Sequence, residues 1–133
     1  MVLVVGSKFN KSTVVFQILW MVMLMLSDFF DSIKDYYAEL DRTKRAQQGA
    51  LVHDTEKGIF GVSDIEVMFK FFKTIGLSKE DVLIDLGSGD GRVALVAGLF
   101  SEAIGIEYDQ ELVRESIAAA AAVGVKAAFY TKD

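Results

Sequence analysis

Two acidic positions and the glycine-rich stretch beside one of them hold the residue types that could do chemistry. The stretch Asp85-Leu-Gly-Ser-Gly-Asp-Gly91 directly follows an apolar run, and Glu107 ends the next apolar run. Alternating glycines let the backbone turn sharply and let a ligand approach where side chains are missing. The amides of such a loop, with a helix N-terminus behind them, favour negative groups such as a carboxylate or a pyrophosphate.

The spacing between loop and acid suits a nucleoside. Glu107 lies 16 residues after Gly91, which leaves room for one helix and one strand. Ligands of open α/β sheets bind at the carboxyl ends of the strands. A carboxylate at the second strand end can accept hydrogen bonds from both hydroxyls of a ribose lying across the two strand ends. The sequence therefore predicts a nucleoside-binding site.

The elements that must position these residues alternate between strand and helix. We predict a strand at 82–86, a helix at 92–100, a strand at 103–107, a helix capped by Asp109 and ended by Gly124, and a strand beginning at 125–130. The run Val82–Leu86 is short and apolar, which is typical of a strand buried on both faces. The order β-α-β-α-β predicts an α/β fold with a parallel sheet.

Two helices are predicted before the sheet. The first is capped by Ser27 or Asp28 and runs to about residue 46, with a charged patch at 41–45 that we interpret as a solvated last turn. Residues 47–62, which include His53, are predicted to form a loop. The second helix starts with a capping box at 63–66, in which Ser63 is the cap, and stops at Gly76.

The composition changes at residue 26/27. Residues 1–26 hold Lys8, Lys11 and no acid, whereas the other 12 bases and all 19 acids follow, giving +2 and −7. We expect an apolar N-terminal segment at 1–26 and one partial domain at 27–133. For the segment we favour a misplaced start, then an extra apolar element packed on the domain, and a membrane anchor third, because the 14 apolar-rich residues 13–26 would reach only about 21 Å as a helix.

The composition also excludes several classes of site. The 133 residues are 52% apolar, which supports one small domain with a buried core. The chain contains no Cys and one His, so disulfide scaffolds, thiolate metal sites and multi-histidine metal sites are excluded, and no metal is expected. A net charge of −5 disfavours binding a nucleic-acid backbone by charge alone.

Two nucleoside cofactors compete for the loop. The residues Gly89-Asp-Gly91-Arg-Val-Ala94 fit a GxGxxG/A dinucleotide fingerprint, but that register leaves Asp85 and Gly87 unexplained. Read from Asp85, the loop resembles the first motif of class I S-adenosylmethionine-dependent methyltransferases, and Glu107 stands where their ribose-binding acid is expected. Within that family, the pattern of a short helix before an acid-x-Gly-x-Gly-Asp-Gly-Arg loop is similar to that of small archaeal methyltransferases, including protein-lysine methyltransferase-like ones.

The resemblance covers residues 28–133 and implies a Rossmann-like parallel sheet of the methyltransferase type, incomplete because three of the family's seven strands are present. It implies that Asp85 lies near the methionine ammonium, that Glu107 holds the ribose, and that Asp90 and Arg92 stabilise the loop. The cofactor-binding residues that it implies are Asp85, Gly87, Ser88, Gly89, Gly91, Glu107, Tyr108 beside the adenine ring, and Asp133 at the adenine amino group, with Ser63 a further candidate near the methionine carboxylate. No catalytic residue is assigned.

The function that the resemblance implies is the cofactor-binding part of an S-adenosylmethionine-dependent methyltransferase, whose acceptor is a protein, a nucleic acid or a small molecule. Three alternatives stay open: a non-catalytic module that holds S-adenosylmethionine or, less favoured, NAD; a truncated remnant that needs a partner chain; and a purely structural protein that associates through an exposed sheet edge. We expect a cytoplasmic location and a partner chain or self-association that completes the sheet. A membrane is not expected as a partner.

Overall fold

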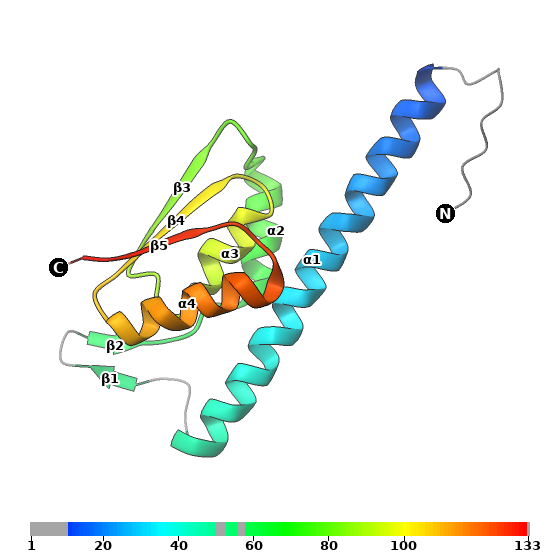
Figure 1. Cartoon of the computed structure of the whole chain (residues 1–133). Helices are drawn as coiled ribbons and strands as arrows, with labels where there is room; N and C mark the ends of the chain where they lie inside the picture. The colour runs from blue at the N-terminus through cyan, green and yellow to red at the C-terminus, as the bar shows by residue number, and fades with distance from the viewer. Residues whose placement is uncertain (1–10, 50–52, 56–57, 133) are drawn as a thin grey trace.

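A long helix, a small hairpin and an α/β unit follow one another along the chain (Figure 1). The structure is a computed structural model that describes residues 11–49, 53–55 and 58–132. Its elements are, in order, α1 (Lys11–Gln48), β1 (His53–Thr55), β2 (Gly58–Phe60), α2 (Ile65–Ile75), β3 (Val82–Leu86), α3 (Arg92–Gly98), β4 (Glu102–Glu107), α4 (Gln110–Val123) and β5 (Ala128–Thr131).

The main sheet has the strand order β3-β4-β5, and both pairs of strands are parallel. Leu86 at the end of β3 lies opposite Ile106, and Glu107 at the end of β4 lies opposite Thr131. The carboxyl ends of β3 and β4 are therefore neighbours. The predicted β-α-β-α-β order, preceded by two helices, is confirmed.

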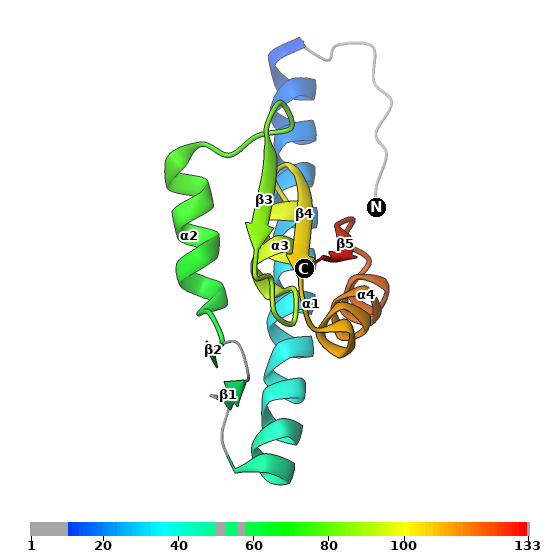
Figure 2. The same ribbon diagram turned by 90° about the vertical axis from the view of Figure 1, so that its left-hand side faces the viewer.

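All the helices that contact this sheet lie on one side of it. Helices α3 and α4 pack on the strands, α2 packs beside α3, and α1 crosses α3 and α4. Figure 1 shows the resulting layers, with the sheet on the left and α1 on the right. Figure 2 is turned by 90°, so that the sheet lies in front of α3 and α1. The ring of Phe69 on α2 stacks on Phe30 of α1 at 4.0 Å and tilts against Phe100 at 5.2 Å, so aromatic contacts join the layers.

No helix or strand that the structure describes covers the opposite face of the sheet, which we call the bare face. Val82, Ile84 and Leu86 of β3 are 54%, 57% and 75% exposed, and Tyr130 of β5 lies exposed on the same face. The prediction that β3 is buried on both faces is therefore wrong for the described chain. The composition of β3 is that of a doubly covered strand, but no described element lies over this side.

Helix α1 differs from the helix predicted at 27–46, because it starts at Lys11 and passes through Ser27 and Asp28 without a break. These residues cap a helix only where the chain turns out of helical geometry, and here the apolar run before them is helical as well. The second half of α1 buries Ile33 and Tyr37 in the core, whereas the side chains from Val14 to Met25 are exposed. The proposed boundary at 26/27 stays a prediction.

Several local predictions are refined by the structure. Asp64, rather than Ser63, caps α2, since its carboxylate accepts from the Val67 amide. The predicted caps Asp109 and Gly124 of α4 are confirmed, as is Gly76 after α2. Part of the predicted loop 47–62 forms the antiparallel pair β1–β2, whose three-residue strands are too short to show an alternating pattern.

Candidate functional site

The glycine loop bends over the carboxyl end of β4. Gly87, Gly89 and Gly91 have φ of +76°, +56° and +83°, a left-handed conformation that side-chain-bearing residues rarely adopt. The amides of Gly87 and Ser88 both donate to the Ile106 carbonyl, at 2.8 and 3.1 Å. The alternating glycines are therefore required by the turn itself, and the turn ties the loop to the neighbouring strand.

Glu107 joins the two strand ends through its carboxylate. Oε2 accepts from the Gly89 amide at 2.8 Å, and Oε1 accepts from the amides of Tyr108 and Asp109 at 2.7 and 3.0 Å. A carboxylate offers about four acceptor positions, so three are used and one, on Oε2, is left. A ligand that engages both oxygens must take the place of a backbone amide.

Asp85 lies below the loop at the end of β3 and is half-buried. Burial raises the pKa of the Asp85 carboxyl above its ordinary value, and the nearby negative charge of Glu107 raises it further. The charge of Glu107 at the adjacent strand end thus opposes the ionisation of Asp85. A cationic group between them would relieve this repulsion, which makes the pair a candidate partner for an ammonium.

A buried ionic cluster anchors the loop to α1. The guanidinium of Arg92 forms hydrogen bonds with both oxygens of Asp90 and with both oxygens of Asp41, at 2.7 to 3.2 Å. Its side chain is 6% exposed and that of Asp90 is 3% exposed. Burial alone would lower the pKa of Arg92, but the two carboxylates raise it above its usual range, so Arg92 stays charged. The structure places Asp90 and Arg92 in direct contact, and their predicted loop-stabilising role stays a prediction.

Tyr37 of α1 completes this cluster. Its hydroxyl donates to the backbone carbonyl of Asp90 at 2.7 Å, and the Arg92 guanidinium lies 4.6 Å from the centre of its ring. A little further along α1, Lys44 pairs with Glu115 of α4 at 2.6 Å. The interpretation of 41–45 as a solvated last turn is therefore wrong for Asp41 and Lys44.

Gly91 and Gly105 are needed for close packing behind the loop. A Cβ atom on Gly91 would come within 2.7 Å of Ser116 on α4 and 2.9 Å of Phe129. A Cβ atom on Gly105 would come within 2.6 Å of Phe129 and 2.8 Å of the Ser88 hydroxyl. The Ser116 hydroxyl, which is fully buried, also lies 3.2 Å from the Gly89 carbonyl and donates to Leu112. Gly91 therefore fits the loop against α4 and β5.

A cavity of about 150 Å³ opens beside the loop. Its lining combines the Gly61–Ser63 segment before α2 with Asp85 and the loop residues up to Val93. The structure thus brings the predicted residues Asp85, Gly87, Ser88 and Gly89 together with Ser63. Among the residues described, no group of three or more histidine or carboxylate side chains is placed to hold a metal ion.

The other predicted site residues have varied positions. Tyr108 follows β4 and is half exposed, whereas Asp133 lies outside the described residues. The buried hydroxyl of Ser88 has no hydrogen-bond partner in the described part of the chain and lies near Gly105. Contact between these residues and a cofactor stays a prediction.

Four residues that support the site were not predicted from the sequence: Tyr37, Asp41, Gly105 and Ser116. One signal was available for two of them, since Ile33, Tyr37 and Asp41 recur every four residues and so share one face of α1. Ile33 and Tyr37 are buried, which places Asp41 at the edge of the buried face. The sequence holds no comparable signal for Gly105 or Ser116, whose contacts join distant segments.

Comparison with known proteins gives matches among solved structures. No protein-family model and no curated protein sequence matches the chain. An RNA methyltransferase from Salinibacter ruber in complex with S-adenosyl-L-homocysteine matches with 32% identity and a TM-score of 0.50, over 54% of this chain and 50% of that one. A protein-L-isoaspartate O-methyltransferase matches with 21% identity and a TM-score of 0.50, over 62% of this chain and 28% of that one, which shows the fold alone.

These matches confirm the resemblance to class I S-adenosylmethionine-dependent methyltransferases over about half of the chain, and with it the partial Rossmann-like fold. The chain spans half or less of the length of these two structures. They do not single out protein-lysine methyltransferases, so that finer resemblance is unsupported.

Proposed function

We propose that this chain, which matches class I S-adenosylmethionine-dependent methyltransferases over about half its length, binds S-adenosylmethionine at the glycine loop and is the cofactor-binding part of a methyltransferase. The observation that carries the proposal is the 2.8 Å hydrogen bond between the Glu107 carboxylate and the Gly89 amide. It brings the acid of the second strand end to the glycine loop of the first. A nucleoside lying across the two strand ends would meet both.

The cavity beside the loop fits the amino-acid end of this cofactor. Its volume of about 150 Å³ is below the roughly 300–1,000 Å³ of whole small-molecule sites, so it suits a part of the ligand. Asp85 would accept from the methionine ammonium, whose positive charge would favour the ionised carboxylate against the burial and the Glu107 charge that raise its pKa. Ser63 lies across the same cavity and would donate to the methionine carboxylate.

The adenosine end would lie at the end of β4. The ribose hydroxyls would donate to Glu107, using its remaining acceptor position and replacing the Gly89 amide at Oε2. Tyr108, which follows directly and is half exposed, would flank the adenine ring. The proposal keeps Asp133 as the acceptor for the adenine amino group.

The bound cofactor would supply a methyl group on a sulfonium: an acceptor nucleophile would attack the methyl carbon in line, and the carbon–sulfur bond would break with its electron pair leaving on the thioether. The residues described here bind and orient: the loop passes under the cofactor, Asp85 and Glu107 hold its two ends, and the Arg92 cluster keeps the loop rigid. A second hollow of about 470 Å³ shares Ser63 and Arg92 with the first. We propose that a protein, nucleic-acid or small-molecule acceptor approaches through it.

We also propose that the chain acts in the cytoplasm, where S-adenosylmethionine is made and used. We further propose that another protein surface packs on the bare face of the sheet. Val82, Ile84 and Leu86 present a contiguous apolar strip on that face. A partner chain or a second copy of this chain would cover it. Light scattering of the purified chain, alone and with candidate partners, measures which of the two applies.

The experiment that tests cofactor binding is a calorimetric titration of S-adenosylmethionine into the full chain and two variants. Glu107→Ala removes the acid at the carboxyl end of β4, and Glu102→Ala removes an exposed acid at the other end of the same strand. We expect the first variant to lose binding at least tenfold, since a hydrogen bond to a charged group contributes about 1.5–3 kcal/mol. The second should bind like the unmodified chain.

Two outcomes would contradict the proposal. If the folded chain binds no S-adenosylmethionine but binds NAD, the loop serves a dinucleotide. If both glutamate variants lose binding equally, the cofactor does not lie at the carboxyl ends of the strands. Circular dichroism of each variant confirms that the fold is retained.

A further inference from the structure

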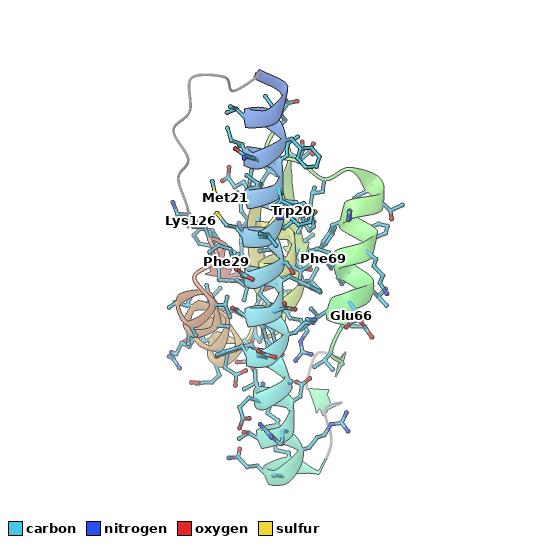
Figure 3. All side chains as sticks on the ribbon, turned by 90° about the vertical axis from the view of Figure 1, so that its right-hand side faces the viewer. Trp20, Met21, Phe29, Glu66, Phe69 and Lys126 are labelled. Carbon is cyan, nitrogen blue, oxygen red and sulfur yellow. The ribbon has the colours of Figure 1, made fainter. Side chains whose placement is uncertain are left out.

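The first half of α1 is largely exposed, and only its last residues, among them Val22 and Met25, line an open hollow beside the α/β unit. Every apolar side chain from Val14 to Met25 is between 40% and 68% exposed, although the same helix is buried at Ile33 and Tyr37. Figure 1 shows this half extending past the α/β unit, and Figure 3 shows Trp20 and Met21 on different sides of it. Of the helices that the structure describes, α1 is long and apolar enough to cross a membrane by length and composition.

The apolar surface extends around the whole helix. Successive residues of an α-helix point about 100° apart, so the eleven apolar side chains between Val14 and Met25, interrupted only by Gln17, cover all sides. A groove on another protein, or a second helix, would cover one side and leave the rest in water. A helix that is apolar all round belongs in an interior that surrounds it, and a lipid bilayer provides one.

We propose that the first half of α1 inserts into the hydrocarbon of a lipid bilayer and holds the α/β unit at the membrane surface. Charges bracket the inserted segment in the sequence: Lys8 and Lys11 precede it, and Asp28 and Asp31 follow it, with no charged residue between Lys11 and Asp28. The side chain of Asp31 is exposed and pairs with Lys34. The chain therefore leaves the hydrocarbon where α1 turns polar and begins to pack on the domain.

The length of the segment sets how it inserts. Residues 12–27 are uncharged and span about 24 Å as a helix, less than the roughly 30 Å of a hydrocarbon core. Long lysine side chains can extend toward the headgroups, and a bilayer thins around a short segment. This proposal departs from the sequence-based expectation, which ranked a membrane anchor third, because the described part of the chain leaves the apolar side chains from Val14 to Met25 between 40% and 68% exposed.

Trp20 is the single tryptophan of the chain and lies in the middle of the segment, so its fluorescence reports insertion directly. The full chain is mixed with phosphatidylcholine vesicles, whose neutral surface does not repel the acidic domain. We expect the Trp20 emission to shift to shorter wavelength, to be quenched by brominated acyl chains, and to become protected from aqueous iodide. The chain should also float with the vesicles in a density gradient.

Two matched double variants distinguish insertion of α1 from nonspecific adsorption through other exposed apolar side chains. Leu19→Asp with Met23→Asp places two charges one turn apart on the segment, and Val67→Asp with Phe71→Asp does the same at exposed apolar positions of α2. The first pair should lose flotation and the Trp20 shift, whereas the second pair should keep both. All four positions are exposed, so the fold should tolerate the changes.

Three results would overturn the proposal. One is a chain that neither floats nor shifts its Trp20 emission. Another is loss of flotation in the α2 variant but not in the α1 variant, which would assign membrane binding to the other surface. The last is a dimer by light scattering in which Trp20 is already shielded from iodide without lipid, which would show that a second copy covers the helix.

Discussion

The two faces of the three-stranded sheet have opposite surroundings although they come from the same strands. On the face toward α3 and α4, Ala103 and Phe129 are buried and Gly105 allows side chains to approach closely. On the other face Ile84 and Leu86 are exposed. Both faces are apolar, so the difference lies in what packs against each one. Strand composition indicates that burial is needed, and only the neighbouring elements show whether the chain provides it.

The difference between the two faces also shows which side of the candidate site is held by packed side chains. Behind the loop, Arg92, Asp90 and Asp41 satisfy one another's charges in the interior, and Ser116 packs against Gly91. The bare face is mostly apolar, with the exposed Glu102 beside Val82 at one end. Substitutions on the covered side should therefore cost far more stability than matched ones on exposed surfaces.

The largest effect is expected for Arg92→Ala. It leaves the buried Asp90 and the partly buried Asp41 without their partner, which typically costs about 3–5 kcal/mol of unfolding free energy. Arg114→Ala removes the same charge from an exposed pair with Glu111 and should cost at most about 1 kcal/mol. Urea denaturation measures both. Equal losses would show that the Arg92 cluster does not hold the loop.

A smaller effect is expected for Gly105→Ala. The added methyl group would come within 2.6 Å of the Phe129 ring, and overpacking of this kind costs about 1–3 kcal/mol. Gly61→Ala is the matched control, because a Cβ there meets nothing within 4 Å. The difference in thermal midpoint between the two variants gives the result. A tolerated Gly105→Ala would mean that Phe129 is free to move away.

The pH dependence of cofactor binding should follow Asp85. Because its pKa is raised in the free protein and its ionised form is the one that accepts from an ammonium, affinity should rise as pH increases through that pKa. Below it, affinity should fall by up to about tenfold per pH unit. Calorimetry over the acidic range measures this slope, and Asp85→Asn should flatten it. An unchanged slope in the variant would assign the titration to another group.

The smallest effect is expected for Ile84→Thr on the bare face. Since Ile84 is mostly exposed, the change in unfolding free energy should stay within about 0.5 kcal/mol. Leu95→Ala on the fully buried side of α3 should cost about 2–5 kcal/mol. If the two variants lost similar stability in chemical denaturation, the bare face would be covered in solution.

The local signals in the sequence were sufficient for most of the α/β unit. The strand at Val82–Leu86 and the caps of α4 were predicted correctly because apolar runs, an Asp cap and a Gly stop are all local. The glycine loop and Glu107 were recognised for the same reason. Alternating glycines and an acid at the next strand end are visible in the sequence alone, and the structure brings them within hydrogen-bond distance.

The remaining features depend on segments that are far apart. The Asp41–Arg92 pair joins residues 51 positions apart, so the charges at 41–45 could be interpreted only as a helix end. The predicted start of helix α1 lies too far along the chain, because Ser27-Asp28 is a cap signal that the helical residues on either side of it override. Exposure of β3 is likewise a property of the elements around it rather than of the strand.

The most direct test of cofactor binding at Glu107 and the glycine loop is to follow backbone amide signals by NMR while S-adenosylmethionine is added. We expect the amides held by Glu107, those of Gly89, Tyr108 and Asp109, to shift most, because the ribose competes for the same carboxylate. The amides of Gly98 and Gly124, away from the carboxyl ends of the strands, should stay unchanged. Shifts confined to those distant glycines, or none in the loop at saturating cofactor, would contradict the proposed site.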